Sequence, residues 1–264
     1  MLNWIRQHLL AFAALVVLAY MLLPNLVVAI FSFNDPRGRY NYQWSQFSTE
    51  AWRNPCGNPG ICEALGLSLR IGLIASLTAT VLGTLVAFAL GRYAFRGRGI
   101  TNLLIFMPMA TPEVVMGSSL LTLFVMAGFP SGAVNITIAH IMFCVSFVVV
   151  AVKARISTLD PALEEAAADL GASPLQTFAR VTLPLAAPGI AAGALLAFSL
   201  SFDDYIITNF NASPSSITFP MYVWGASQRG TPVEVFVIGT LMFLIALAVV
   251  VFGQVLSARR ERNA

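Results

Sequence analysis

Six long apolar stretches constrain this chain more than any other feature of its sequence. A helix needs about 20 apolar residues to cross the hydrocarbon core of a bilayer. Only 10% of the 264 residues are charged and 58% are hydrophobic, whereas soluble domains carry about 25% charged residues. We therefore predict an all-α integral membrane protein with six transmembrane helices. The predicted spans are residues 9–31, 67–90, 103–124, 134–152, 188–210 and 236–256.

The same composition excludes two other classes of protein. Apolar blocks of this length are incompatible with intrinsic disorder. The chain has a net charge of +3, but its basic residues form no cluster of the kind that binds nucleic acid. We interpret residues 9–31 as an uncleaved helix, because the apolar region is too long for a signal peptide and no small-residue cleavage site follows it.

The distribution of lysine and arginine predicts the orientation. With the N-terminus in the cytoplasm, ten of these residues fall inside and five outside, which favours two cytoplasmic termini. We divide the chain into residues 1–66, with the first span and an extracytoplasmic loop, and residues 67–264, a core with five spans.

The three cysteines suggest one disulfide. Cys56 and Cys62 flank a turn-rich segment, and a disulfide between them is expected if this loop is extracytoplasmic. Cys144 lies in an apolar stretch, where it is predicted to be a small buried side chain. No metal site is predicted, since further ligands are not nearby.

Small residues and prolines predict how the spans pack and bend. Small side chains at helical spacing let two helix backbones approach closely. Pro108 and Pro112 are expected to kink or break the span at 103–124. Two stripes of small residues occur, namely Gly83, Ala87 and Gly91, and Gly189, Gly193, Ala197 and Ser201.

The segment between the fourth and fifth spans predicts a helical hairpin on the cytoplasmic face. Asp160 suits a helix N-cap and Pro161 the first helical position. Gly171 can end that helix in a left-handed conformation. A capping box then predicts a second short helix, formed by Ser173 and Gln176 with Pro174 between them.

The first of these helices has an apolar face that leaves two interpretations open. The residues of this face recur at helical spacing and are Leu163, Ala166, Ala167 and Leu170. The hairpin could lie at the membrane surface with no partner, or it could dock into a groove of another protein.

One motif in this hairpin resembles the EAA motif of ABC importer permeases. Glu165-Ala166-Ala167 is followed after three residues by Gly171, and after nine more by Val181-Thr-Leu-Pro184. The family pattern differs only in having isoleucine at the position of Val181. The resemblance implies the type I permease fold and identifies the hairpin as a coupling helix that docks onto a cytoplasmic ATPase. The coupling residues that it implies are Glu164, Glu165, Ala166, Ala167, Asp169, Gly171 and Pro184.

The resemblance also implies partners and a location. The partners are a second permease subunit, two copies of an ATPase and an extracytoplasmic substrate-binding protein, in a lipid membrane and without nucleic acid. ATP and Mg would be bound by the ATPase, since this chain contains no P-loop, and this chain would be a non-catalytic, cofactor-free subunit. It would be a multi-pass protein of the cell (inner or plasma) membrane.

Two further stretches resemble the C-type permease subunits of spermidine/putrescine importers. These are residues 112–117 and residues 199–205, the latter leading on through 219–220 to 232–234. The resemblance implies a polyamine cargo. An importer of iron or another metal complex, of an amino-acid derivative or of an oxyanion stays an alternative.

Three carboxylates within the spans suggest how a cation would be recognised. Glu113, Asp203 and Asp204 are each expected roughly 20–24 Å from the cytoplasmic boundary, and ionisable residues inside a membrane suggest functional sites. Their charge would attract a cation and repel an anion. Three aromatic residues could add cation–π contacts, namely Phe202, Tyr205 and Trp224.

Other interpretations of these residues stay open. Asp203 and Asp204 could mark a helix end, and Glu113 could begin a half-helix. The aromatic residues could anchor the chain at the membrane interface. His140 is expected to be packed and hydrogen-bonded. An ion-coupled transporter would need an internal repeat, and an intramembrane enzyme would need a catalytic set; we find neither.

Overall fold

The computed structural model describes residues 2–262, with side chains for residues 8–253. By packing, the chain forms two units: the residues up to Cys62 together with those from Tyr222 onward, and Glu63–Met221. The described residues are helical apart from loops and one isolated β-bridge between Asn34 and Phe47. The division into residues 1–66 and 67–264 remains a prediction.

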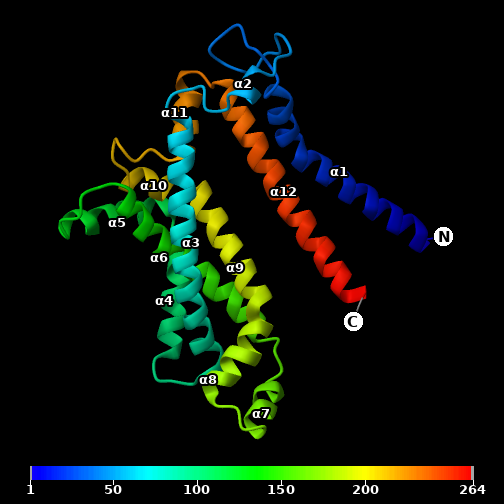
Figure 1. Cartoon of the computed structure of the whole chain (residues 1–264), viewed down its shortest axis with the longest axis vertical. Coiled ribbons are helices and arrows are strands. Elements are labelled where there is room, and N and C mark those ends of the chain that lie inside the picture. The colour runs from blue at the N-terminus through cyan, green and yellow to red at the C-terminus, as the bar shows by residue number, and fades with distance from the viewer. Residues whose placement is uncertain (1, 263–264) are drawn as a thin grey trace. The chain divides into compact units, whose positions relative to one another are not determined.

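The first unit contains two long helices and a folded loop (Figure 1). Helices α1 (Leu2–Phe31) and α12 (Val233–Arg262) meet where Phe31 lies 6.5 Å from Phe236, measured between ring centroids. The loop after α1 is organised by Asn34, whose side-chain amide donates to Asn41 Oδ1 at 2.7 Å. Helix α2 (Glu50–Arg53) follows, and the unit also includes the part of α11 (Phe219–Arg229) from Tyr222 onward.

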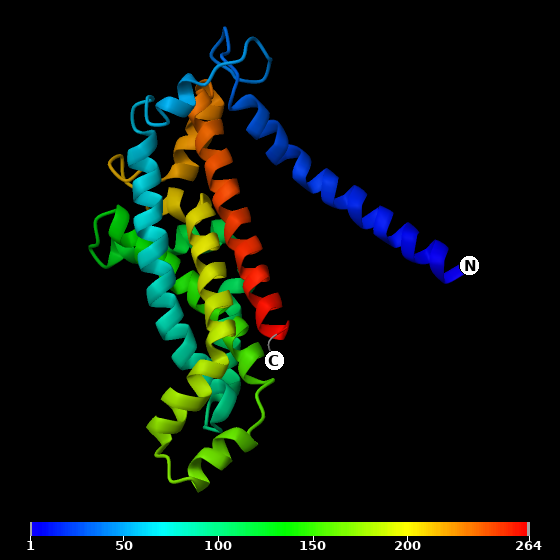
Figure 2. The same ribbon diagram turned by 45° about the vertical axis from the view of Figure 1, so that its right-hand side comes forward.

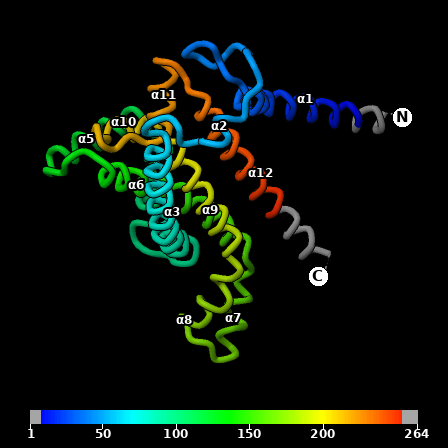
Figure 3. The backbone as a smooth tube through the Cα atoms, turned by 45° about the horizontal axis from the view of Figure 1, so that its top comes forward, coloured from blue at the N-terminus to red at the C-terminus, as the bar shows by residue number. Residues whose placement is uncertain are grey.

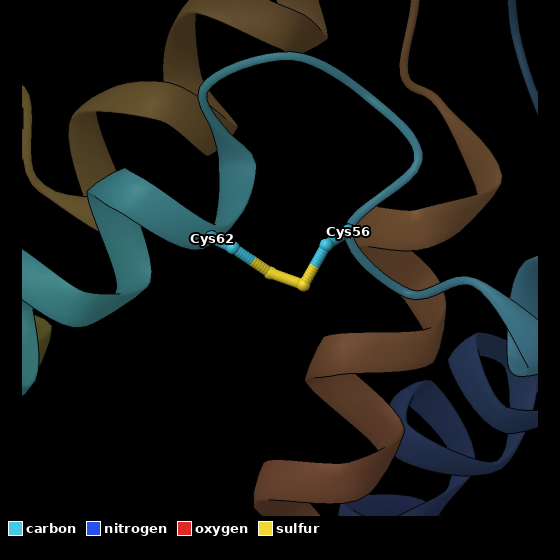
Figure 4. Close-up of a disulfide and its surroundings, with 2 residues drawn as sticks. All are labelled: Cys56 and Cys62. Atoms are coloured by element: carbon cyan, nitrogen blue, oxygen red, sulfur yellow. A yellow bond between two sulfur atoms is a disulfide. The ribbon is translucent and has the colours of Figure 1, made fainter.

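A disulfide joins Cys56 to Cys62 in this unit (Figure 4). Their Cα atoms are 5.4 Å apart, which is ordinary disulfide geometry. The Tyr222 hydroxyl donates to Asn58 Oδ1 at 2.6 Å inside the loop that the disulfide closes. The loop is thereby tied to the start of α11.

The second unit is built around α6 (Ala133–Ile156), which packs against α3 (Ile61–Arg92) and α9 (Leu183–Asp203). The cyan α3 and the yellow α9 run alongside each other in Figure 2. The predicted stripes of small residues make these contacts. A Cβ added at Gly83 of α3 would lie 2.7 Å from Val148 Cβ on α6, and one added at Gly193 of α9 would lie 3.5 Å from Val148 Cα. Ala87 on α3 and Ala197 and Ser201 on α9 are also buried, so both stripes face the interior of this unit.

The predicted third span is broken. Helix α4 (Arg98–Ala110) and helix α5 (Glu113–Met126) are bent by 108° at Thr111 and Pro112. Thr111 is extended, with ψ of 132°, as expected for a residue before proline. The predicted break is therefore confirmed at Pro112, whereas Pro108 lies inside α4 without ending it.

The described residues hold five helices long and apolar enough to cross a membrane, or six if the bent pair counts as one span. This agrees with the predicted all-α membrane fold. The bent pair corresponds to the predicted third span.

The fifth span differs most from its prediction. The predicted second short helix, α8 (Pro174–Thr177), runs without a stop through a π-helical turn, η1 (Phe178–Thr182), into α9. The helical run from Pro174 ends at Asp203, and α10 (Ile206–Asn211) is separate. The π-turn has a local cause, since Pro184 has no N–H to continue the α-helical ladder.

Candidate functional site

The first helix of the hairpin, α7 (Ala162–Asp169), lies at one end of the second unit, with α5 and α10 toward the other (Figure 3). It begins one residue later than predicted, because Pro161 is the N-cap. Asp160 still satisfies the helix start, since its Oδ1 accepts the Ala162 N–H at 3.0 Å. Gly171 ends the helix with φ of +82°, and the capping box of Ser173 and Gln176 begins α8, as predicted.

Glu164 attaches the hairpin to the long helices. Its Oε1 lies 3.1 Å from Arg92 Nε in the last turn of α3, and it accepts a hydrogen bond at 3.1 Å from Thr182 Oγ1. An edge-to-face contact of Phe178 with Phe88, 4.9 Å between centroids, adds an apolar attachment. Glu164 therefore faces the rest of its unit.

The opposite surface of the hairpin is exposed. No residue of α7 is buried, so the described residues leave most of its predicted apolar face uncovered. Leu170 is 90% exposed and Leu175 is 76% exposed. The predicted coupling residues Glu165, Ala166, Asp169, Gly171 and Pro184 are also exposed, and Ala167 is half-buried. Exposed leucines beside acidic side chains form a surface suited to a groove on another protein.

The second unit also contains an open acidic pocket of about 270 Å³. Glu113, the first residue of α5, and Asp203, the last of α9, both line it and are both exposed. The interpretations as a half-helix start and a helix end are thus both confirmed. Asp204 and Tyr205 line the same pocket, and no lysine or arginine is among its described lining residues.

Asp204 is held differently from Asp203. Its side chain is only 5% exposed. Its Oδ1 accepts the Thr208 N–H at 2.8 Å and the Thr208 hydroxyl at 2.9 Å, and lies 3.2 Å from His140 Nε2. The carboxylate is therefore a structural acceptor at the break between α9 and α10.

His140 is packed and hydrogen-bonded, as predicted. It is buried on α6, and its Nδ1 lies 2.7 Å from Ser201 Oγ on α9. Sequence reasoning did not connect it with Asp204. The available signal was its position as an ionisable residue inside an apolar stretch.

The predicted aromatic residues do not form one cluster with the pocket. Tyr205 lines it, whereas Phe202 packs against Phe198 and Phe219 at centroid distances of 5.9 and 6.4 Å and is not among the lining residues. Trp224 belongs to the first unit and is 55% exposed, so its predicted role in the path remains a prediction. Within the described residues, no group of three His, Cys, Asp or Glu side chains could hold a metal ion.

An all-helical membrane fold with an exposed hairpin between two spans defines a class of transport permease. Residues 79–263 match the family described as binding-protein-dependent transport system inner membrane component, and the chain belongs to that family. Its members are permease subunits of ABC importers, which are non-catalytic. This multi-pass membrane chain is thus a permease subunit.

Two relatives are similar over most of the chain. The spermidine/putrescine transport system permease protein PotC of Escherichia coli (strain K12) is 34% identical over 245 residues, which are 93% of this chain and 92% of the relative. The putrescine transport system permease protein PotI of the same strain is 37% identical over 252 residues, which are 92% and 89% of the two chains.

Solved structures share the fold at low identity. A chain from a bacterial ABC transporter that imports the acidic polysaccharide alginate superposes with a TM-score of 0.69 at 17% identity, covering 97% of this chain and 96% of the other. A chain of the methionine ABC transporter MetNI, in inward-facing conformations, gives a TM-score of 0.61 at 15% identity, covering 73% and 92%.

Proposed function

We propose that this chain forms half of the translocation path of an ABC importer for polyamines, with both termini in the cytoplasm. The cargo is proposed from one observation above all: two exposed carboxylates, Glu113 and Asp203, share a pocket that no described lysine or arginine lines. A pocket of this charge attracts cations and repels anions. The two relatives, a spermidine/putrescine permease and a putrescine permease, support the same cargo class.

The pocket geometry suits a flexible cation with separated charges. Glu113 and Asp203 come from the ends of two different helices, so one ammonium group could lie near each carboxylate. Tyr205 also lines the pocket, and cation–π contacts between ammonium groups and aromatic rings contribute roughly 0.5–2 kcal/mol. Asp204, held by His140 and Thr208, sets the position of the helix end that carries Asp203.

The partners follow from the hairpin and from the family. Two cytoplasmic ATPase subunits would bind ATP and Mg. One would bind the exposed surface of Leu170, Leu175 and Glu165 on this chain, and the other would bind the corresponding surface of a second permease. An extracytoplasmic binding protein would deliver the cation. Closure of the ATPases would push the hairpin and tilt the spans.

ATP-dependent uptake of labelled spermidine and putrescine by the full reconstituted complex tests this proposal. Glu113→Gln and Asp203→Asn should each raise the KM for uptake by about tenfold, since each removes about 1.4 kcal/mol of attraction. Glu63→Gln is the matched control, because Glu63 is an exposed carboxylate on α3 outside the pocket lining.

Two results would contradict the proposal at different levels. An assembled complex that hydrolyses ATP but takes up no polyamine would overturn the cargo. Parental uptake by both carboxylate variants would overturn the assignment of the acidic pocket while leaving the cargo standing.

A further inference from the structure

We infer that the Arg92–Glu164 ion pair transmits movement of the hairpin to α3, which makes both residues positioning residues for transport. This inference rests on the proposed coupling function of the hairpin. It concerns the inner side of α7, away from the exposed surface that would meet the ATPase.

Glu164 is distinct among the acidic residues of α7. Its side chain is 29% exposed, whereas Glu165 and Asp169 point outward and are exposed. Its partner Arg92, with a side chain 19% exposed, is in the last turn of α3. Both side chains are thus partly shielded from solvent, and screening of the two charges is weaker than it would be at a fully exposed surface.

Chain connectivity explains why α3 needs such a contact. The hairpin is joined directly to α6 on one side and to α9, through η1, on the other. Helix α3 ends far earlier in the sequence, at Arg92. A push on the hairpin reaches α6 and α9 through the backbone, but it reaches α3 only through side chains.

Apolar packing between α3 and the hairpin side is concentrated at the contact of Phe88 with Phe178. An open pocket of about 500 Å³ lies between them, lined on the α3 side by Leu85, Ala89 and Tyr93, among others, and on the hairpin side by Ala168 and Ala172, among others. Arg92 and Glu164 both line this pocket. The ion pair therefore adds a charged link between α3 and α7 across this pocket, beside the one aromatic contact.

A single carboxylate oxygen contacts both long helices. Glu164 Oε1 is 3.1 Å from Arg92 Nε on α3 and 3.1 Å from Thr182 Oγ1 at the end of η1, next to α9. The π-helical turn is a less regular joint than an α-helical one, and such turns occur often at functional sites. Movement of α7 would thus shift α3 and the base of α9 together.

Two N–H groups of Arg92 are not hydrogen-bonded to any described residue in this conformation. Arg92 Nε and Nη2 are buried and have no hydrogen-bond partner among the described residues, although Nε lies at ion-pair distance from the carboxylate. Charge rather than aligned hydrogen bonding holds the pair in this conformation. A small shift of α7 could align these donors, so the contact can differ in strength between two positions of the hairpin.

The experiment measures how many ATP molecules the reconstituted complex hydrolyses for each spermidine imported. Arg92→Gln and Glu164→Gln should each raise this ratio by about fivefold, the lower end of ordinary coupling effects. ATPase binding to the membrane subunits should stay at the parental level. Arg96→Gln is the matched control, because Arg96 is an exposed arginine near the same end of α3.

A double variant with the two charges exchanged tests whether the ion pair itself, rather than either residue alone, is needed for coupling. Arg92→Glu combined with Glu164→Arg should bring the ratio back toward the parental value. Glu164→Asp keeps the charge but withdraws the carboxylate by one methylene, and it should raise the ratio less than Glu164→Gln. If the glutamine variants do not assemble, Glu164→Asp and the exchange decide the question.

An unchanged ratio in assembled single variants, or an exchange that restores nothing, would overturn the inference. These failures are separable from failure of the proposed function. If the parental complex imports no spermidine, the cargo proposal fails before any variant is compared.

Discussion

At the scale of single residues, neighbouring carboxylates differ in what surrounds them. Asp203 is exposed at the acidic pocket, whereas Asp204 is buried and accepts hydrogen bonds from the backbone and hydroxyl of Thr208. The helix ends between them, so the two side chains are not related by regular helical rotation. One carboxylate is free for a ligand and the other maintains the local fold.

We expect Asp204→Asn to destabilise the subunit and Asp203→Asn to leave its stability unchanged. Asn has one acceptor oxygen and no charge, so Asp204→Asn should lower the free energy of unfolding by about 2 kcal/mol, as for hydrogen bonds to charged groups. Thermal unfolding in detergent would measure this as a lower Tm. Equal Tm values for the two variants would contradict the structural role of Asp204.

At the scale of elements, contacts between α3 and α6 depend on glycine at particular positions. A Cβ at Gly83 would meet Val148 at 2.7 Å, while a Cβ at Gly66, on the same helix, would meet nothing within 4 Å. The same substitution therefore has opposite expected effects at two positions of one helix.

Gly83→Ala should destabilise the subunit by about 1–3 kcal/mol through overpacking. Gly66→Ala is the matched control and should be neutral or stabilising by up to about 1 kcal/mol, because alanine favours helix. Thermal unfolding of both variants in detergent is the measurement. Similar Tm values for both variants would mean that α3 does not pack on α6 through Gly83.

The exposed hairpin leucines give a second prediction at this scale. Leu170→Asp and Leu175→Asp should each weaken ATPase binding by more than about tenfold, since burying one leucine contributes roughly 1.5–3 kcal/mol. Copurification of the ATPase with the membrane subunits measures this. Ser157→Asp, at an exposed position after α6, should leave binding unchanged; a loss there would indicate a nonspecific charge effect.

At the scale of the whole molecule, the loop that contains Cys56 and Cys62 can be used to test both the orientation of the chain in the membrane and the oxidation of these two cysteines. Cys56 and Cys62 are joined, and Cys144 is buried. The lysine and arginine distribution favours an extracytoplasmic position for residues 32–60. An oxidising compartment is where such a disulfide persists.

A membrane-impermeant maleimide should label two cysteines in intact cells only after reduction, and Cys144 should stay unlabelled. Cys56→Ser should allow labelling of Cys62 without reductant. Mass spectrometry of the purified subunit gives the count. Labelling that requires cell lysis would reverse the orientation, and labelling of the parent without reductant would mean that the disulfide is absent.

Much of this fold follows from local chemistry that a sequence displays. The number of spans follows from the length of apolar stretches against a fixed bilayer thickness. The break at Pro112, the left-handed Gly171 and the capping box of Ser173 and Gln176 each depend on a few adjacent residues. The inward-facing stripes of small residues follow from helical periodicity alone.

Only the tertiary structure decided which way individual charged side chains turn. The sequence alone did not decide which of Asp203 and Asp204 faces the path, and it grouped Glu164 with the docking residues. In the structure His140 holds Asp204, and Arg92 faces Glu164 from a distant part of the chain. The continuous run from Pro174 to Asp203 was likewise not foreseen. Local patterns determine where helices form, but the rotation of each helix is set by partners distant in sequence, and that rotation places the charges.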